Sequence, residues 1–145
     1  MDLRTNYPRS PREKMAGYTH LARMIDKCRA VLAGTQGEYK YPCPLDQRLL
    51  EFTGIEAGHF TAIVRGAKDD KAVADWFKET AKPHSAEAIE RWNQEFLNSK
   101  PATDDQRAYH RGQVNAIDPS RTDITTWGDM LDLDENRPVP IRTRS

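Results

Sequence analysis

Cysteine is scarce in this sequence, with only Cys28 and Cys43 among 145 residues. Two cysteines are too few for a disulfide framework, so both are expected to be free thiols. The chain also lacks the roughly 18 consecutive apolar residues that a membrane-spanning helix needs, and its first residues contain no apolar signal-peptide core. These absences predict a cytoplasmic protein with no membrane partner.

An excess of either charge is also missing, because 22 Lys and Arg residues balance 22 Asp and Glu residues. Without an overall positive field, nothing draws the chain to nucleic acid or to an anionic membrane, and we predict no nucleic-acid partner. The charge is nevertheless uneven, since residues 1–30 have a net charge of +4 and residues 104–136 a net charge of −5. These two segments could attract each other.

Sequence signatures of several common chemistries are absent. There is no GxSxG nucleophile motif, no P-loop and no dinucleotide-binding glycine pattern. The four histidines stand at no metal-ligand spacing from either cysteine, and the acidic run at 129–135 lacks the glycine and the ligand order of a calcium loop. We therefore predict no metal site and no cofactor, and we interpret the acidic run as a solvent-exposed face.

Helical periodicity dominates what the sequence does contain. Apolar residues recur at helical spacing, and capping residues or glycines mark the ends of the helices. Helices are expected after the capping box at Ser10, from His20 to near Gly34, over 45–52 and 56–65, from Asp69 or Asp70, from Ser85, over 103–117 and over 127–131. No hairpin is expected. The predicted fold class is all-α, a single domain of about five to seven short helices over residues 1–136 with a disordered tail at 137–145.

The segment YKYPCPLD constrains its own backbone. Pro42 and Pro44 push the residues before them, Tyr41 and Cys43, out of the helical region. Pro44 suits the first position of the following helix, which makes Cys43 the N-cap of that helix. Because the amide dipoles at a helix start favour a thiolate, Cys43 is a candidate reactive or ligand-contacting group. Tyr39 and Tyr41 are expected to flank it.

A purely structural interpretation of Cys43 competes with this one. The two prolines can serve only to stiffen the start of the helix above a small buried thiol. The carboxylate of Asp46, one turn further on, would also oppose a thiolate. The structural interpretation is favoured, and Cys43 is the candidate catalytic residue if the protein is an enzyme.

The segment LLEFTGIEAGHFTAIVRG, residues 49–66, matches a helix-turn-helix template. Gly54 falls at the turn, and Phe60 and Ile63 fall at buried positions of the second helix. DNA binding is disfavoured, because Leu50 stands where a small residue normally lets the helices cross closely and because the segment has a net charge of −1. A structural pair of helices is the preferred interpretation.

Four polar residues, His20, Arg23, Asp26 and Lys27, accompany the apolar stripe of the helix that starts near His20. They can project polar groups into a site, or they can pair with one another on the helix surface at i,i+3 and i,i+4 spacing. Surface pairing is the favoured prediction.

Three blocks, SPREKMAG, LARMIDKCRAVLAGTQGEYKYPCPLDQRLLEFTGI and RTDITTWGDMLDLDE, resemble a family of small bacterial proteins classed as a domain of unknown function. The resemblance spans residues 2–136 and implies a bacterial, cytosolic, single-domain protein, but no activity, cofactor or catalytic residue. The chain departs from the family at Ala22, where many relatives have proline. The helix can therefore begin near His20 or continue from Pro11.

These blocks contain more polar residues than a core needs, and they supply the candidate ligand-binding residues: Arg23, Asp26, Tyr39, Tyr41, Cys43, Asp46, Arg121 and Asp123. The sequence predicts that the protein binds a small polar or anionic ligand in a cleft near YKYPCPLD, with Arg23 and Arg121 as charge partners. An interaction module that docks a protein partner is the alternative, and a DNA-binding helix-turn-helix protein comes third.

Overall fold

The computed structural model of the chain describes residues 2–142. Its contacts divide the chain into two compact units, of which the first ends at Arg91 and the second begins at Trp92. The described residues are mainly helical, as predicted. Their elements are β1 (Lys14–Met15), β2 (Tyr18–Thr19), α1 (Leu21–Ala33), α2 (Pro44–Thr53), α3 (Ala57–Gly66), α4 (Asp70–Thr80), α5 (Ala86–Leu97), α6 (Asp104–Ile117) and α7 (Trp127–Asp134). Across residues 2–142, no helix combines the length and the apolar content needed to cross a bilayer.

A short antiparallel hairpin stands where the sequence predicted a first helix. The strands pair Met15 with Tyr18, and the two residues between them, Ala16 and Gly17, have φ values of 55° and 87°. Two consecutive residues with positive φ match the right-handed twist of a two-residue hairpin. The helix predicted after Ser10 and the predicted absence of a hairpin are therefore wrong.

Helix α1 begins after a residue in the left-handed region. His20 has a φ of 71°, and its backbone amide donates to the carbonyl of Pro11 at 3.0 Å. The chain thus turns sharply before Leu21, so the helix starts near His20, as predicted, and does not continue from Pro11. At the other end Gly34, with a φ of 69°, terminates the helix, a conformation that glycine adopts at little cost.

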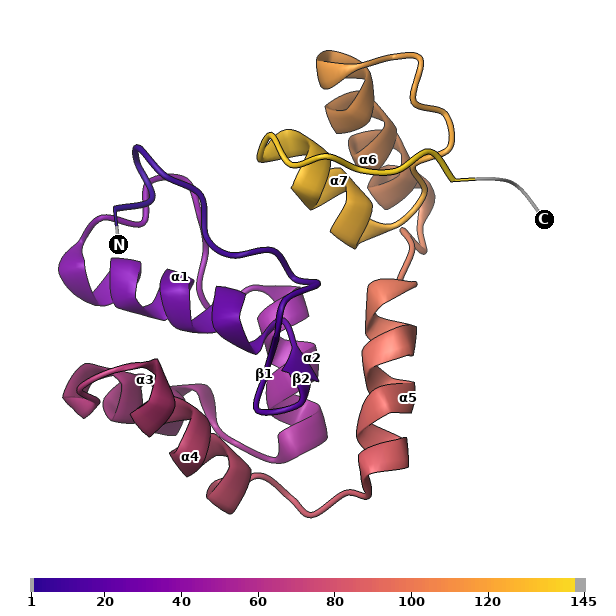
Figure 1. The fold of residues 1–145 in the computed structure, drawn as a ribbon. Helices are drawn as coiled ribbons and strands as arrows, with labels where there is room; N and C mark the ends of the chain where they lie inside the picture. The colour runs from indigo at the N-terminus through magenta and orange to yellow at the C-terminus, as the bar shows by residue number, and fades with distance from the viewer. Residues whose placement is uncertain (1, 143–145) are drawn as a thin grey trace. The chain divides into compact units, whose positions relative to one another are not determined.

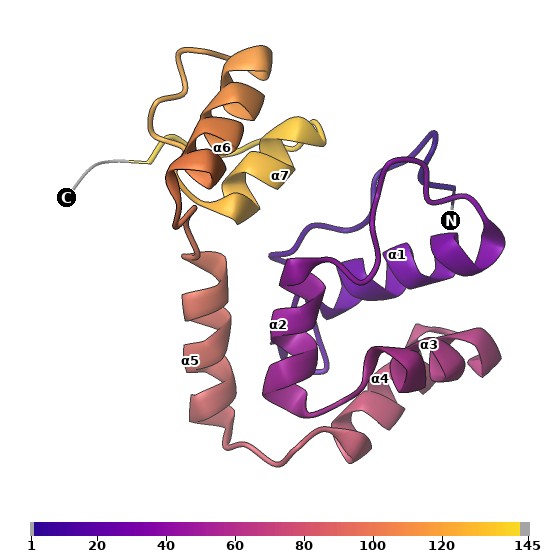
Figure 2. The same ribbon diagram turned by 180° about the vertical axis from the view of Figure 1, so that it is seen from behind.

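An aromatic cluster fills the core of the first unit beside α1. In Figures 1 and 2, α3 and α4 run along one side of α1, while the hairpin and α2 lie at its N-terminal end. The ring of Phe77 meets those of Tyr18 and Phe60 edge-on, with centroids 5.2 Å and 6.1 Å apart. Cys28 of α1 is completely buried in this core.

The helix starts predicted at Asp69, Ser85 and residue 103 are confirmed. The carboxylate of Asp69 accepts from the amide of Ala72 at 2.9 Å, and the hydroxyl of Ser85 accepts from the amide of Ala88 at 3.1 Å. Thr103 opens α6 with a reciprocal capping box formed with Gln106. Side chains that satisfy the first amides of a helix act over three residues only, which is why these positions could be predicted locally.

The second unit packs α6 and α7 around a small apolar core. Its buried members are Val114, Ile124, Met130 and Val139. Part of the predicted tail, residues 137–142, belongs to this described unit, and the rest of it, residues 143–145, lies outside the described residues.

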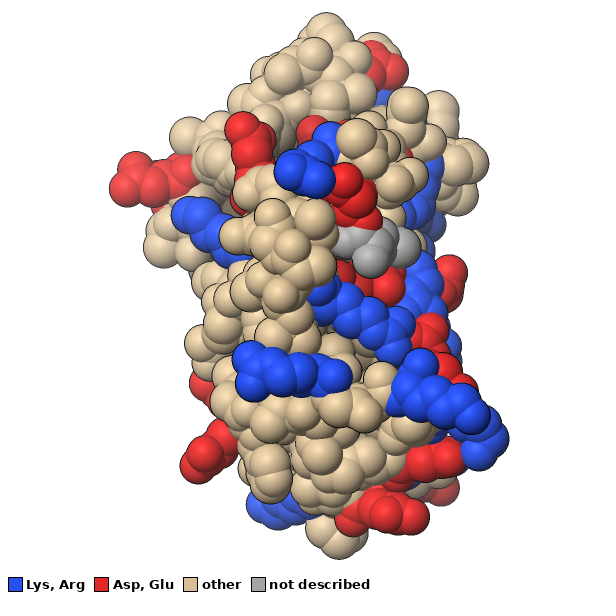
Figure 3. Space-filling model, turned by 90° about the vertical axis from the view of Figure 1, so that its left-hand side faces the viewer, with Lys and Arg blue, Asp and Glu red and all other residues tan. Residues whose placement is uncertain are grey.

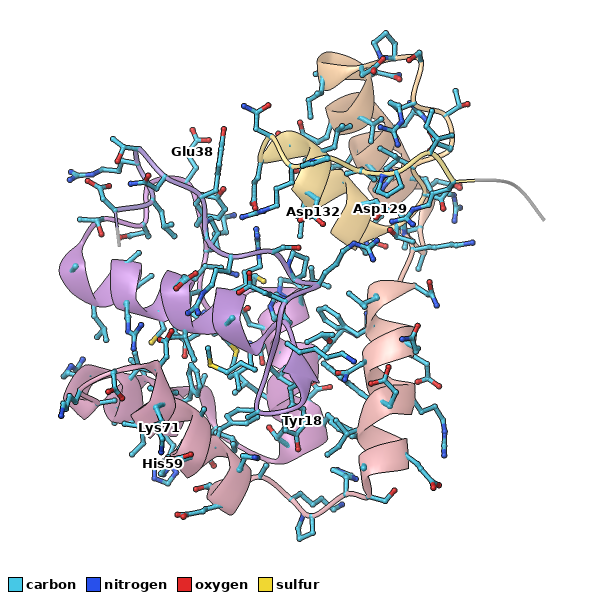
Figure 4. The ribbon with its side chains drawn as sticks, viewed as in Figure 1. Tyr18, Glu38, His59, Lys71, Asp129 and Asp132 are labelled. Atoms are coloured by element: carbon cyan, nitrogen blue, oxygen red, sulfur yellow. The ribbon has the colours of Figure 1, made fainter. Side chains whose placement is uncertain are left out.

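Most of the acidic run in and after α7 is buried, although Asp134 is exposed. Asp129, Asp132 and Glu135 are at most 4% exposed, so the prediction of a solvent-exposed acidic face is wrong. Figure 4 shows Asp129 and Asp132 on α7. Arg142 donates two hydrogen bonds of 3.0 Å to the carboxylate of Asp129, and Arg137 donates to Glu135 at 2.5 Å. Arginines from the following segment neutralise these carboxylates, which lets them leave water.

Candidate functional site: a buried polar network around Asp46

The polar residues at the start of α1 are buried. His20 is fully covered, and Arg23, Asp26 and Lys27 are each 3% exposed. The prediction that they pair with one another on the helix surface is therefore wrong. Buried charges require compensating partners. Partners of these residues lie outside α1, in the N-terminal segment, in α2 and in the loop before α2.

Asp46, at the third position of α2, has a fully buried side chain and gathers three donors. Its Oδ1 accepts from Nε2 of His20 at 2.6 Å, and its Oδ2 accepts from Nζ of Lys27 at 2.7 Å. The same Oδ2 accepts from the backbone amide of Cys43 at 2.9 Å. We call His20, Lys27, Cys43 and Asp46 the Asp46 network.

The protonation states within this network follow from burial and pairing. Burial lowers the pKa of His20 despite the opposing effect of Asp46, so the ring is neutral and its Nε2–H donates to the carboxylate. Burial alone would raise the pKa of Asp46, but the hydrogen bonds and charges of His20 and Lys27 outweigh it and hold the pKa well below its usual range. Asp46 is therefore ionised, and Lys27 is its counter-ion.

Cys43 is the part of the network that reaches the surface. It is the N-cap of α2, as predicted, with extended backbone angles of −95° and 172°. Its side chain is half-buried, and its sulfur lies 3.1 Å from Nζ of Lys27. An ammonium beside the sulfur favours an anion bound at this position.

The two predicted tyrosines flank this region in different ways. Tyr41 shares a hydrogen bond of 2.9 Å with Thr61 on α3, and burial raises the pKa of Tyr41 far above its usual range. Its hydroxyl is therefore a permanent neutral group. Tyr39 lies on the loop after α1, which also carries Glu38 (Figure 4), and the guanidinium of Arg23 lies 5.7 Å from the centre of its ring.

A second charged group lies around Asp26, the residue that precedes Lys27 on α1. Arg9 donates to Asp26 through its backbone amide at 2.8 Å and through Nε and Nη2 at 3.0 Å each. The remaining guanidinium nitrogen of Arg9 donates to Asp70 at 2.9 Å, and Arg29 donates to the same carboxylate at 2.5 Å. This group ties the N-terminal segment and α4 to α1.

The predicted site residues divide between the two units. Six of them, including Asp26 and Asp46, belong to the first unit. Arg121 and Asp123 belong to the second, where they form an ion pair of 3.1 Å and where Asp123 also accepts from the backbone amide of Arg142 at 2.8 Å. The pKa of Asp123 lies well below its usual range chiefly because of the hydrogen bond from Arg121.

Sequence reasoning did not place Lys27, Arg9 or Asp70 in the candidate site. The partners of these residues are 13 to 61 positions away in the chain, so no local spacing connects them. One local signal was available for Asp46. With Cys43 as the N-cap, a capping box places the carboxylate of Asp46, the third helical residue, at the backbone amide of Cys43. Among the described residues, no group of three or more His, Cys, Asp or Glu side chains could hold a metal ion.

Comparison with known proteins identifies the family of the chain. No curated protein sequence matches the chain. One family model matches residues 5–137, which include both the Asp46 network and the Arg121–Asp123 pair. With 133 of 145 residues covered, the chain belongs to the family described as a domain of unknown function, DUF5069.

Proposed function

We propose that the protein binds a small anionic ligand beside Cys43, with the ammonium of Lys27 as the charge that attracts it. The observation that carries this proposal is the 3.1 Å contact between Nζ of Lys27 and the sulfur of Cys43. Lys27 is 3% exposed, whereas Cys43 is half-buried. A ligand that approaches the Asp46 network from water therefore meets the sulfur first and the ammonium directly behind it.

The fixed geometry of Lys27 supports a binding role. Its Nζ is held by Asp46, which is held in turn by His20 and by the amide of Cys43. An ammonium has three donors, so the bonds to Asp46 and to the sulfur leave a third donor for a ligand oxygen. A pre-organised donor loses little conformational entropy when a ligand binds.

The distribution of surface charge favours a small ligand over a polyanion. On the face shown in Figure 3, Lys and Arg side chains are interspersed with Asp and Glu. Nucleic-acid binding needs a stripe or patch of basic side chains that follows the phosphates. A single buried cation beside a half-buried side chain suits one carboxylate or phosphate group instead.

The test compares two alkylating reagents of nearly equal size at Cys43. Iodoacetate carries a negative charge and iodoacetamide does not, and peptide mass mapping separates the modification of Cys43 from that of Cys28. We expect Cys43 to react well before the fully buried Cys28. We also expect Cys43 to react with iodoacetate faster, relative to iodoacetamide, than the thiol of glutathione does. Inorganic phosphate should slow both reactions at Cys43.

Two variants of Lys27 assign the effect to its charge. Two unit charges at 4 Å interact by about 1 kcal/mol even in bulk water, a factor of about five in rate. Lys27→Met should lower the iodoacetate-to-iodoacetamide ratio by about that factor or more, whereas Lys27→Arg should preserve it. The matched control is Lys40→Met, which removes an exposed charge from the loop that leads to Cys43. A ratio that is unchanged in Lys27→Met, or lowered equally in the Lys40 control, would refute the proposal.

A further inference from the structure

A hollow in the second unit has a chemistry of its own. It lies between the start of α6 and the loop that leads to α7, and its volume is about 280 Å³. This is close to the lower limit of small-molecule sites, roughly 300 Å³. Its polar lining residues are Lys100, Arg107, His110, Arg111, Thr122 and Thr125. We call this hollow the α6 pocket.

The lining of the α6 pocket is basic. It contains three cationic side chains and two threonine hydroxyls, and none of its lining residues is acidic. Guanidinium and ammonium groups beside hydroxyl donors are the groups with which proteins hold phosphate oxygens. The overall balance of charge in the sequence concealed this concentration, because no acidic residue of the unit lines the pocket.

The cations of the pocket keep most of their charge available. Arg111 donates through Nε and Nη2 to the side-chain oxygen of Asn115 at 3.0 Å and 2.7 Å, and an amide oxygen orients the guanidinium without neutralising it. Arg107 bonds to Asp104, but that carboxylate is 98% exposed, and an ion pair in water is weak. Lys100 is exposed, and none of the residues in the range 2–142 offers it a carboxylate within salt-bridge distance.

The wall of the pocket is fixed by the core of the second unit. Ile124 lines the pocket and is also a core residue with 1% exposure. Nε2 of His110 donates to the carbonyl of Thr126 at 2.9 Å, and the ring of Trp127 packs edge-on against His110 with centroids 5.4 Å apart. The amide of Trp127 donates to the carbonyl of Ser99 at 3.1 Å, which joins the segments that carry Thr125 and Lys100.

We propose that the α6 pocket binds a small phosphate monoester. The phosphate would lie between the cations and the two threonine hydroxyls, and the organic group would contact Ile124 and Pro101, the apolar residues of the lining. This site is separate from the one proposed beside Cys43 and does not depend on it.

The experiment is a titration of the ¹⁵N-labelled full-length protein, at low ionic strength, with phenyl phosphate, inorganic phosphate and phenol. Phenyl phosphate should produce saturable shifts of the amides of Lys100, Thr122, Ile124 and Thr125, with inorganic phosphate weaker and phenol without effect. Cys43 alkylation, measured in the same samples, reports separately on the site in the first unit.

Matched variants separate a built site from general charge attraction. Lys100→Gln and Arg111→Gln should each weaken phenyl phosphate binding by about tenfold, the loss expected for one charge-assisted hydrogen bond. Lys78→Gln and Arg65→Gln remove equivalent exposed charges from the first unit and should change the affinity less than twofold. The proposal is overturned if no saturable shifts appear up to about 10 mM phosphate ester, where even millimolar binding would show. It is also overturned if phenol binds as well as its ester, or if the control variants weaken binding as much as the pocket variants do.

Discussion

Replacing Asp46 by asparagine tests the central claim about the first unit. Asparagine has nearly the same shape as aspartate, so the substitution opens no cavity. It removes the charge that neutralises Lys27 across 2.7 Å. It also puts an amide group opposite Nε2 of His20, which donates to Asp46 at 2.6 Å.

The expected loss of stability follows from the burial of Lys27. With 3% exposure, its ammonium cannot recover the lost interaction from water. Removing one partner of a buried ion pair costs about 3–5 kcal/mol, mainly because the other charge remains buried and uncompensated. A domain has only about 5–15 kcal/mol of unfolding free energy in total. Asp46→Asn should therefore lose a large fraction of the stability of its unit.

Urea unfolding followed by circular dichroism at 222 nm measures this loss, and the exposed pair Lys71–Asp75 provides the control. The side chains of that pair are 83% and 57% exposed, so Asp75→Asn should change stability by less than about 1 kcal/mol. In the double variant Lys27→Met/Asp46→Asn the buried charge is gone as well. Its loss should be smaller than the sum of the two single losses, because the two residues interact directly.

A small effect would refute the reasoning. If Asp46→Asn costs less than about 1 kcal/mol, the typical net value of an ordinary hydrogen bond, then Lys27 does not depend on Asp46 for its charge balance. Strict additivity in the double variant would lead to the same conclusion. Either result would also weaken the proposal that Lys27 is held rigidly behind Cys43.

Three further predictions follow from other features of the chain. Stability should fall as the pH is lowered through about 6.5, because burial lowers the pKa of His20 and only the unfolded chain takes up a proton there. Stability should fall further below about pH 3.8, where the contribution of the ionised Asp46 is lost. Urea midpoints measured between pH 8 and pH 3 would show both steps. Phe77→Ala should cost about 3–5 kcal/mol, since the ring is fully buried against two aromatic neighbours; a midpoint shift worth less than about 1 kcal/mol would contradict this packing. In a mobility-shift assay at physiological salt, the protein should not bind duplex DNA with a dissociation constant below about 10⁻⁶ M. Tighter, salt-sensitive binding that Arg65→Ala abolishes would restore the helix-turn-helix interpretation of residues 49–66.

Local patterns in the sequence were sufficient where a few neighbouring residues decide the structure. Pro44 fixes the start of α2 and makes Cys43 its N-cap, and Asp69 and Thr103 satisfy the first amides of α4 and α6. The motif at Ser10 failed because a capping box is only a start signal. The following Ala16 and Gly17 adopt positive φ values, and alanine does so too seldom for its presence to have indicated a hairpin.

The charged residues of the candidate site could not be located in this way. Charged side chains are seldom fully buried, so Arg23, Asp26 and Lys27 were assigned to the helix surface by default. Their burial depends on counter-charges from distant segments, such as Arg9 for Asp26 and Asp46 for Lys27. One sequence does not show which distant residue supplies the opposite charge, so the helix was predictable and its environment was not.

The double role of Asp46 affects how the first unit opens. Its Oδ2 atom caps α2 through the amide of Cys43 and neutralises Lys27 of α1. The first turn of α2 therefore cannot fray in isolation, because fraying would withdraw the carboxylate from a buried ammonium. Amide hydrogens at helix starts usually exchange with solvent quickly, through small local openings. The Cys43 amide should instead exchange only when α1 and α2 separate, so that a surface-adjacent position reports on the cooperative unfolding of the whole unit.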